Sequence, residues 1–199
     1  MPRSRKVEAE TALNAALVLF WKQGFSGLGT RQLEEETGLT RFTLQTSYGG
    51  KKALFIQVLD NYCDGFEAQI LPTVSEHGIE VLAAWFEMRA DPDMMPETGC
   101  YGCLMLNATI EFQGQDAEVN QRTERYFSGF RNSFAAILND AKQSGQLPAG
   151  FDVAAKTEML LGAVLGLNVV IRAGAANEAG APMAAAIAQQ IREWPRPRI

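Results

Sequence analysis

The stretch Thr30-Arg-Gln-Leu-Glu-Glu-Glu-Thr-Gly-Leu-Thr-Arg-Phe-Thr-Leu-Gln-Thr-Ser-Tyr48 carries two short helical patterns on either side of a glycine. Leu33 is the inward apolar residue of the first pattern, and Leu44 can return to the same small core from the second. Gly38 stands where a tight turn requires a left-handed backbone, which glycine adopts at little steric cost. Thr40 suits the N-cap of the second helix. The order of these residues predicts two helices joined by a tight turn.

The second of these helices is expected to present polar side chains outward, namely Arg41, Thr43, Gln45 and Thr46. Hydrogen-bonding side chains on a helix that lies in the major groove are what the reading of base edges requires. Ordinary helical hairpins share this spacing. Two interpretations therefore stay open at this point, a helix-turn-helix that binds DNA and a hairpin that does not.

Basic residues lie on both sides of this pair of helices. Lys51 and Lys52 open the next helix, where an ammonium group or a backbone amide could hold a phosphate. Arg3, Arg5 and Lys6 precede the first helix and would form a flexible arm for contact with the DNA backbone or minor groove. These flanks favour the DNA-binding interpretation.

The charge of the chain is divided unevenly. Residues 1–52 contain eight Lys or Arg and five acidic residues, a net charge of +3. The remaining residues contain ten basic and eighteen acidic residues, a net charge of −8, and the whole chain carries −5. A basic head on an acidic body predicts a polyanionic partner for the head only.

Length and composition indicate a protein with a sizeable core. Hydrophobic residues make up 47% of the 199 positions, which argues against global disorder. We expect a soluble, cytoplasmic protein, because nothing resembles a secretory signal and no stretch approaches the ~20 apolar residues of a membrane span. Three cysteines cannot all pair within one chain, which agrees with a reducing compartment.

Helical periodicity dominates the whole chain, and no stretch gives a convincing run of strands. Glycine and proline mark the ends of the helical segments. The sequence therefore predicts an all-α fold of about nine helices. Beyond the two short helices, a first helix is expected up to Gly24, and the others at Lys51–Ile70, Ile79–Arg89, Leu104–Phe112, Ala117–Ser144, Val153–Ala173 and Pro182–Trp194.

The run from Phe25 to Phe55 resembles the DNA-binding domain of the tetracycline-repressor (TetR) family. The resemblance rests on Gly24-Phe25, Thr30, Gly38-Leu39-Thr40, Leu44, Tyr48, Lys51 and Leu54. It implies a three-helix DNA-binding domain over residues 1–51 and a larger helical domain for effector binding and dimerisation over residues 52–199. The DNA-binding residues are then expected to be Arg3, Arg5, Lys6, Thr30, Arg31, Thr40, Arg41, Thr43, Gln45, Thr46, Tyr48, Lys51 and Lys52.

The sequence departs from the family pattern at a few positions. Glu34 and Thr37 stand where a small alanine is usual, and Gln45 stands where the family commonly places a tyrosine that contacts DNA phosphates. Glu34, Glu35 and Glu36 would repel phosphate, so we expect them on the side of their helix turned away from DNA.

The last two helices are candidates for a dimer interface. The segment Val153–Ala173 mixes small residues with large apolar ones, and its apolar coverage is too wide for a surface helix. Members of the family pair their last two long helices with those of a second subunit. The alternative is that both helices form intramolecular core. The residues expected at the interface are Leu160, Ala163, Leu167, Val170, Met183, Ile187 and Ile191.

Cys100 and Cys103 have a spacing that can indicate metal or redox chemistry. Zinc needs four ligands and a thioredoxin-like site needs strands, so neither is expected, and no metal or cofactor is predicted. Cys103 is then either a small buried residue at a helix start or a reactive thiol. The stretch resembles a Gly-Cys-Leu-x-x-Asn element in one branch of the family, in which some regulators respond to electrophiles or oxidants.

The effector pocket is expected among the middle helices, where family members build a cavity. Methionine and aromatic residues at helical spacing are also typical of plain core, and both interpretations stay open. An apolar or weakly polar ligand is favoured, because few charges lie among them. The candidate effector-binding or sensing residues are Trp85, Met88, Cys100, Cys103, Met105, Asn107, Phe112, Tyr126 and Phe130.

An enzyme is disfavoured, because His77 is the single histidine and no phosphate-cradling motif is present. The sequence predicts a DNA-binding transcriptional regulator, and the resemblance to the TetR family implies a homodimeric repressor released from its operator by a small-molecule or thiol-reactive effector. The alternative is a helical protein-interaction adaptor that has lost DNA binding.

Overall fold

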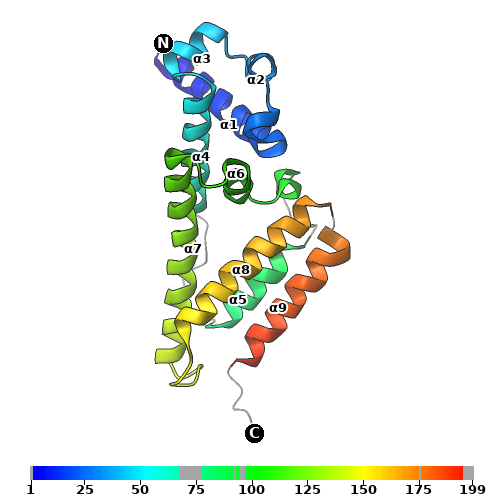
Figure 1. Ribbon diagram of the computed structural model, residues 1–199. Helices are drawn as coiled ribbons and strands as arrows, with labels where there is room; N and C mark the ends of the chain where they lie inside the picture. The colour runs from blue at the N-terminus through cyan, green and yellow to red at the C-terminus, as the bar shows by residue number, and fades with distance from the viewer. Residues whose placement is uncertain (1, 68–77, 92, 95–96, 175, 195–199) are drawn as a thin grey trace. The chain divides into compact units, whose positions relative to one another are not determined.

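The computed structural model describes residues 2–67, 78–91, 93–94, 97–174 and 176–194 (Figure 1). Within these ranges the chain is helical and contains no strand, which confirms the all-α prediction. The helices are α1 (Pro2–Gly27), α2 (Thr30–Thr37), α3 (Arg41–Ser47), α4 (Lys51–Glu67), α5 (Glu80–Arg89), α6 (Leu104–Phe112), α7 (Ala117–Gln143), α8 (Val153–Arg172) and α9 (Ala181–Glu193), with a 3-10 turn η1 (Glu97–Tyr101) and a π turn η2 (Ala176–Gly180).

The chain forms two compact units. Unit 1 comprises Met1–Ala68 and Cys103–Tyr126, and unit 2 comprises Gln69–Gly102 and Phe127–Ile199. Helix α7 begins in unit 1 and continues into unit 2. These units are defined by packing, whereas the DNA-binding domain at residues 1–51 and the effector-binding and dimerisation domain at residues 52–199 were defined by function. The functional division stays a prediction.

Unit 1 is built around four phenylalanine rings. Phe55 on α4 lies 4.9 Å from the ring of Phe20 and 5.2 Å from that of Phe25 on α1, centroid to centroid. Phe112 at the end of α6 stacks on Phe55 at 5.7 Å. Because aromatic rings bury a large apolar area, this cluster joins α1, α4 and α6 into one core.

Ion pairs then attach the first part of α7 to α4 in unit 1. Arg122 donates two hydrogen bonds to Asp60, of 3.0 and 3.1 Å, in the forked geometry that matches a carboxylate. One turn further on, Arg125 donates to Asp64 at 2.8 Å. The polar contacts of α4 with α7 thus continue along the helix beyond the aromatic core.

Unit 2 has its own aromatic core. Trp85 on α5 meets Phe130 and Phe134 on α7 edge-on, with ring centroids 5.8 and 6.0 Å apart. Arg192 on α9 donates to Glu80 and Glu87 on α5, with bonds of 2.5–3.1 Å. These bonds, that to Glu87 first, raise the pKa of Arg192 above its ordinary value and hold α9 along α5.

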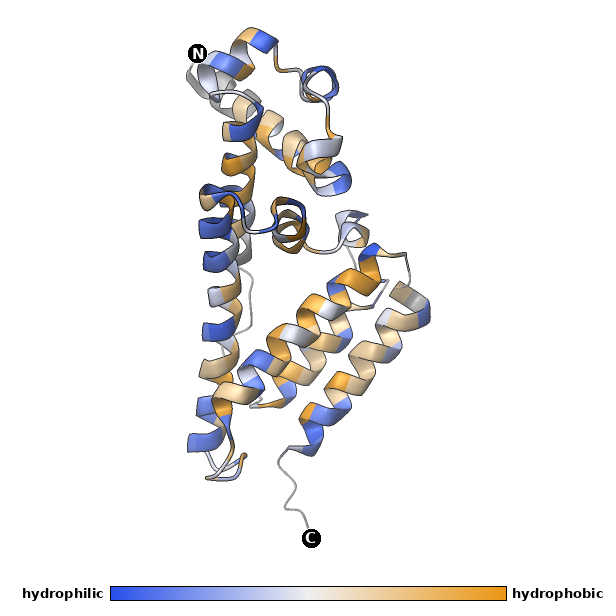
Figure 2. Ribbon diagram, viewed as in Figure 1, coloured by the Kyte–Doolittle hydropathy of each residue, from blue (hydrophilic) through white to orange (hydrophobic). Residues whose placement is uncertain are grey.

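Helix α8 is the most apolar long helix, as Figure 2 shows. The sequence-based prediction that no stretch approaches a membrane span is wrong for this helix, which is long and apolar enough by length and composition. Core helices of globular proteins pass the same test. Only 39% of its most apolar 18-residue window is buried within the chain, and Val169 on this helix is 51% exposed.

Candidate nucleic-acid interface

The corner between α2 and α3 is closed by the backbone and by one threonine. Gly38 has φ 72° and ψ 3°, the left-handed conformation that the turn requires, and its N–H donates to the Glu34 carbonyl at 3.1 Å. The Thr37 hydroxyl donates to the Leu33 carbonyl at 2.6 Å and accepts from the Leu39 N–H at 3.2 Å. The threonine that replaces a family alanine therefore stabilises the turn.

The start of α3 is capped as the sequence predicts. The Thr40 hydroxyl accepts from the Thr43 N–H at 3.1 Å, and the hydroxyl groups of Thr40 and Thr43 lie 2.9 Å apart. Leu44 is 2% exposed and packs α3 onto the rest of unit 1. One leucine and one cap thus determine which face of α3 is turned outward.

Three of the four predicted outward residues, Arg41, Gln45 and Thr46, are exposed. Thr43 is half-buried, because its hydroxyl takes part in the cap. The predicted set of outward residues did not include Phe42, whose side chain is 76% exposed on the same helix. Helical geometry could have found it, because Phe42 lies about 160° around the helix from Leu44.

On α2, Thr30 and Arg31 are both exposed. The Arg31 guanidinium pairs with Glu35 one turn away at 2.8 Å, and Gln32 donates to Glu36 at 2.8 Å. A carboxylate beside Arg31 offsets the positive charge of this predicted DNA-binding residue. Exposed pairs of this kind are weak, so Arg31 can still exchange Glu35 for a phosphate.

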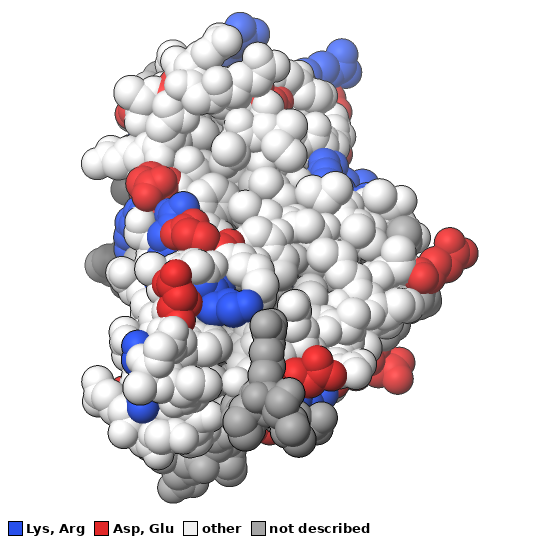
Figure 3. All heavy atoms as spheres, turned by 60° about the horizontal axis from the view of Figure 1, so that its bottom comes forward, with Lys and Arg blue, Asp and Glu red and all other residues white. Residues whose placement is uncertain are grey.

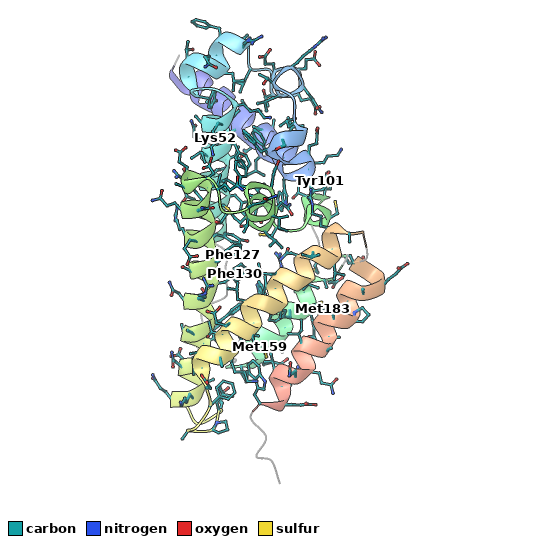
Figure 4. All side chains as sticks on the ribbon, in the orientation of Figure 1. Lys52, Tyr101, Phe127, Phe130, Met159 and Met183 are labelled. Carbon is teal, nitrogen blue, oxygen red and sulfur yellow. The ribbon has the colours of Figure 1, made fainter. Side chains whose placement is uncertain are left out.

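The structure changes the interpretation of the two lysines at the start of α4. The Lys51 ammonium lies 4.4 Å from the centre of the Phe25 ring, and partial burial lowers its pKa, with the nearby Glu111 carboxylate acting in the opposite direction. Lys52 pairs with Asp116 before α7 and lies 4.8 Å from the centre of the Phe112 ring (Figure 4). Both lysines contact groups of their own chain in this conformation, and that they hold phosphate stays a prediction.

The remaining candidates of the head are placed less favourably for DNA. The half-buried Tyr48 donates a long hydrogen bond of 3.5 Å to the Ala9 carbonyl on α1. The backbone of Arg3, Arg5 and Lys6 belongs to α1, which begins at Pro2, so the prediction of a flexible arm before the first helix is wrong. Their side chains lie outside the described residues.

Helix α1 is interrupted at Gly24, where φ is 77° and ψ is 172°. The Glu111 carboxylate on α6 accepts the N–H groups of Phe25 at 2.8 Å and Ser26 at 2.5 Å. Backbone donors that the interruption leaves without a helical partner are thus satisfied by a charged acceptor. The sequence could not show this contact, because 86 residues separate Glu111 from Phe25.

Comparison with known proteins identifies the arrangement. Residues 79–190 match the family described as "Tetracyclin repressor-like, C-terminal domain", and residues 12–58 match "Bacterial regulatory proteins, tetR family". The chain belongs to the TetR family. The resemblance drawn from the sequence is therefore confirmed, and it extends from the head into the body.

Relatives of known sequence and structure agree. The HTH-type transcriptional repressor ComR of Escherichia coli (strain K12) is 27% identical over 181 residues, which cover 88% of this chain and 85% of ComR. A TetR family regulator from Cytophaga hutchinsonii has a TM-score of 0.81 at 18% identity, covering 100% of this chain and 99% of its own. A cysteine mutant of the TetR family regulator CifR, complexed with 26-bp double-strand operator DNA, has a TM-score of 0.76 at 18% identity, covering 93% and 95%.

The candidate effector residues of this TetR family regulator fall into both units. Unit 1 holds Cys103, Met105 and Tyr126, which are buried, and Asn107 and Phe112, which are half-buried. Unit 2 holds Trp85 and Phe130, which are buried in its aromatic core, and Met88 and Cys100, which are exposed. Phe112 belongs to the aromatic core of unit 1. Whether any of them binds an effector stays a prediction.

Cys103 lies at the N-cap of α6 beside the hydroxyl group of Tyr126. Burial raises the pKa of Tyr126 well above its ordinary value, and its hydrogen bonds with Cys103 and Tyr62 act in the same direction. The exposed Cys100 donates to the Glu97 carbonyl at 3.2 Å. No group of three His, Cys, Asp or Glu that could hold a metal ion occurs in the described part of the chain.

The residues predicted to form the dimer interface differ in exposure. Leu160, Leu167 and Ile191 are buried within the single chain, so they form intramolecular core instead of an interface. Ala163, Val170, Met183 and Ile187 are half-buried. Met183 on α9 packs against Gly166 on α8 within the same chain, because its methyl group lies 3.1 Å from where a Cβ on Gly166 would stand (Figure 4).

We expect Glu111→Ala to lower the free energy of unfolding by about 1–3 kcal/mol, because two backbone N–H groups lose a charged acceptor. Glu111→Gln keeps an uncharged acceptor and should lose less. Urea denaturation followed by circular dichroism measures both changes. Glu118→Ala, which removes an exposed carboxylate from α7, is the matched control. Equal stability of Glu111→Ala and Glu118→Ala would contradict a structural role for the Glu111 carboxylate.

Proposed function

We propose that this TetR family regulator is a cytoplasmic repressor that binds an operator through α3. The observation that carries the proposal is the surface of α3, where Arg41 and Gln45 are exposed while Leu44 is buried. Hydrogen-bonding side chains on a short exposed helix suit the major groove. The repressor function of ComR and the operator complex of CifR, two proteins of this family, support the same role here.

We also propose that the protein acts as a homodimer through α8 and α9. On α8 the exposed positions include Gly162 and Val169, and on α9 they include Ala185 and Ala186. Small residues allow close approach of helices, and the uncovered apolar area of α8 supports a partner. In the face of the molecule shown in Figure 3, uncharged residues cover most of the surface, and several acidic and basic groups lie beside one another on its left side. Two copies of α3 about 34–36 Å apart would meet successive major grooves.

Release from the operator is proposed to begin at α6. Cys103 occupies the N-cap position of this nine-residue helix, and Glu111 near its end accepts the N–H groups of Phe25 and Ser26 at the interruption of α1. A ligand or a thiol modification that displaces α6 would therefore weaken the contacts that hold α1 in place. Since α1 belongs to the same unit as α3, the position of α3 would change with it. The trigger acts by favouring a conformation that fits the operator less well.

The test of DNA binding is a gel-shift with the DNA that flanks the gene, at two salt concentrations. The protein should bind one site specifically and bind less tightly as salt rises, because bound phosphates release counterions. Arg41→Ala should lower operator affinity about tenfold or more through loss of a base or phosphate contact. Arg131→Ala, with the same loss of charge on α7 in unit 2, should bind as the wild type does. Absence of any specific site would favour the interaction adaptor instead.

We expect Val169→Asp to abolish the dimer. The side chain is 51% exposed in the single chain, so a carboxylate there costs the folded monomer little, while an apolar interface would bury it unpaired. Sedimentation velocity should then show monomers that no longer bind the operator with high affinity. Ala136→Asp, at an exposed position of α7, should remain dimeric. A fully dimeric Val169→Asp would contradict this interface.

Cys103→Ser tests whether a thiol trigger acts at α6. When the Cys103 thiol adds across the C=C bond of N-ethylmaleimide, the sulfur bonds one alkene carbon, the other takes a proton, and the π bond is lost. The adduct would place a bulky group beside Tyr126, so the wild-type protein should lose operator affinity after treatment. Cys103→Ser should keep its affinity under the same treatment, while Cys100→Ser should respond like the wild type. Unchanged release in Cys103→Ser would show that Cys103 is a structural residue. Gel-shift with and without reagent gives the comparison.

A further inference from the structure

Phe42 is a large apolar side chain on a helix whose other exposed residues are polar. Its 76% exposure is the highest among the large hydrophobic residues described as exposed. It takes part in none of the ring contacts found among the described aromatic residues, such as those that join Phe20, Phe25 and Phe55 in the unit 1 core. A phenyl ring left in water costs the molecule free energy unless a partner covers it.

The hydroxyl donors of α3 are already engaged within the helix. The Thr43 hydroxyl lies 2.9 Å from that of Thr40, and the Thr46 hydroxyl donates to the Phe42 carbonyl at 2.8 Å. The two threonines that the sequence analysis expected to read bases are therefore less available than their exposure suggests. Arg41, Phe42 and Gln45 remain as the side chains that extend from the outward face.

Phe42 occupies the centre of that outward face. It precedes Leu44 by two residues, which places it about 160° around the helix from the buried side. When α3 lies in a major groove with Leu44 toward its own unit, the ring of Phe42 points at the base edges. The feature of a base pair that suits an apolar ring is the C5-methyl group of thymine, which the major groove exposes and cytosine lacks.

We propose that Phe42 contacts a thymine methyl group in each half of the operator and so selects a T·A pair at that position. The proposal rests on operator binding through α3, and it assigns a base preference to a residue outside the hydrogen-bonding set. The contact is apolar, so it contributes to specificity in a way that salt does not screen.

The experiment replaces single thymines by uracil, which removes the methyl group and leaves base pairing and the O4 acceptor in place. The operator is first obtained by selection from random duplexes with the full-length protein. Replacing the contacted thymine in one half-site should weaken wild-type binding about fourfold, the effect of losing one buried methyl. Fluorescence anisotropy gives the affinity of each duplex.

Variants of the protein decide whether Phe42 makes the contact. Phe42→Ala should bind the thymine and uracil duplexes with equal affinity, while Phe42→Leu should keep part of the difference. Ile110→Ala, at a 60% exposed apolar position on α6, is the matched control and should retain the full fourfold difference. Circular dichroism and sedimentation establish that each variant is folded and assembled.

The outcomes separate this proposal from operator binding itself. If the protein selects an operator but no thymine-to-uracil change distinguishes wild type from Phe42→Ala, the thymine contact is wrong and α3 binding stands. A uracil effect that persists in Phe42→Ala assigns the methyl contact to another residue and also overturns the proposal. Failure to select any operator overturns the proposed function together with it.

Discussion

The DNA-facing surface depends on the burial of Leu44. Helix α3 has seven residues, and isolated helices of that length do not form in water. It exists because Leu44 packs into unit 1, Thr40 caps its first turn, and Gly38 turns the chain at its start. Since one buried side chain determines the rotation of so short a helix, it also determines that Arg41, Phe42 and Gln45 face outward.

A second set of contacts ties this surface to α6 and the start of α7. The Glu111 carboxylate holds the N–H groups after Gly24, Lys51 lies over the ring of Phe25, and Lys52 pairs with Asp116. The hydrogen bond from Lys52, followed by that from the Val119 N–H, lowers the pKa of Asp116 below its ordinary value, so this carboxylate stays charged across the neutral range. The interruption of α1 and the beginning of α4 are thus held by charged groups, and a shift of α6 would act on both.

The sequence was sufficient for features that depend on neighbouring residues. The helices, the turn at Gly38, the cap at Thr40 and the inward Leu44 all follow from local spacing, and the structure agrees within a few residues. Contacts between distant segments were not accessible in this way. A lysine at a helix start looks the same whether it faces a phosphate or, as Lys52 does, an aspartate 64 residues later. Periodicity likewise placed Leu160 on an apolar helix face, but it could not show that residues of the same chain bury that side chain.

These intramolecular partners change how the head can recognise DNA. The excess of three positive charges over residues 1–52 includes Arg31, Lys51 and Lys52, and each of these lies against a carboxylate or an aromatic ring. Where the cations keep these partners on DNA, the attraction to phosphate is smaller, and since that attraction is largely independent of sequence, nonspecific binding is smaller too. A larger share of the affinity must then come from direct contacts of α3 with base edges. For a regulator that has to find one site among many, weak attraction to every phosphate and strong complementarity at a few base pairs raise the ratio of specific to nonspecific binding.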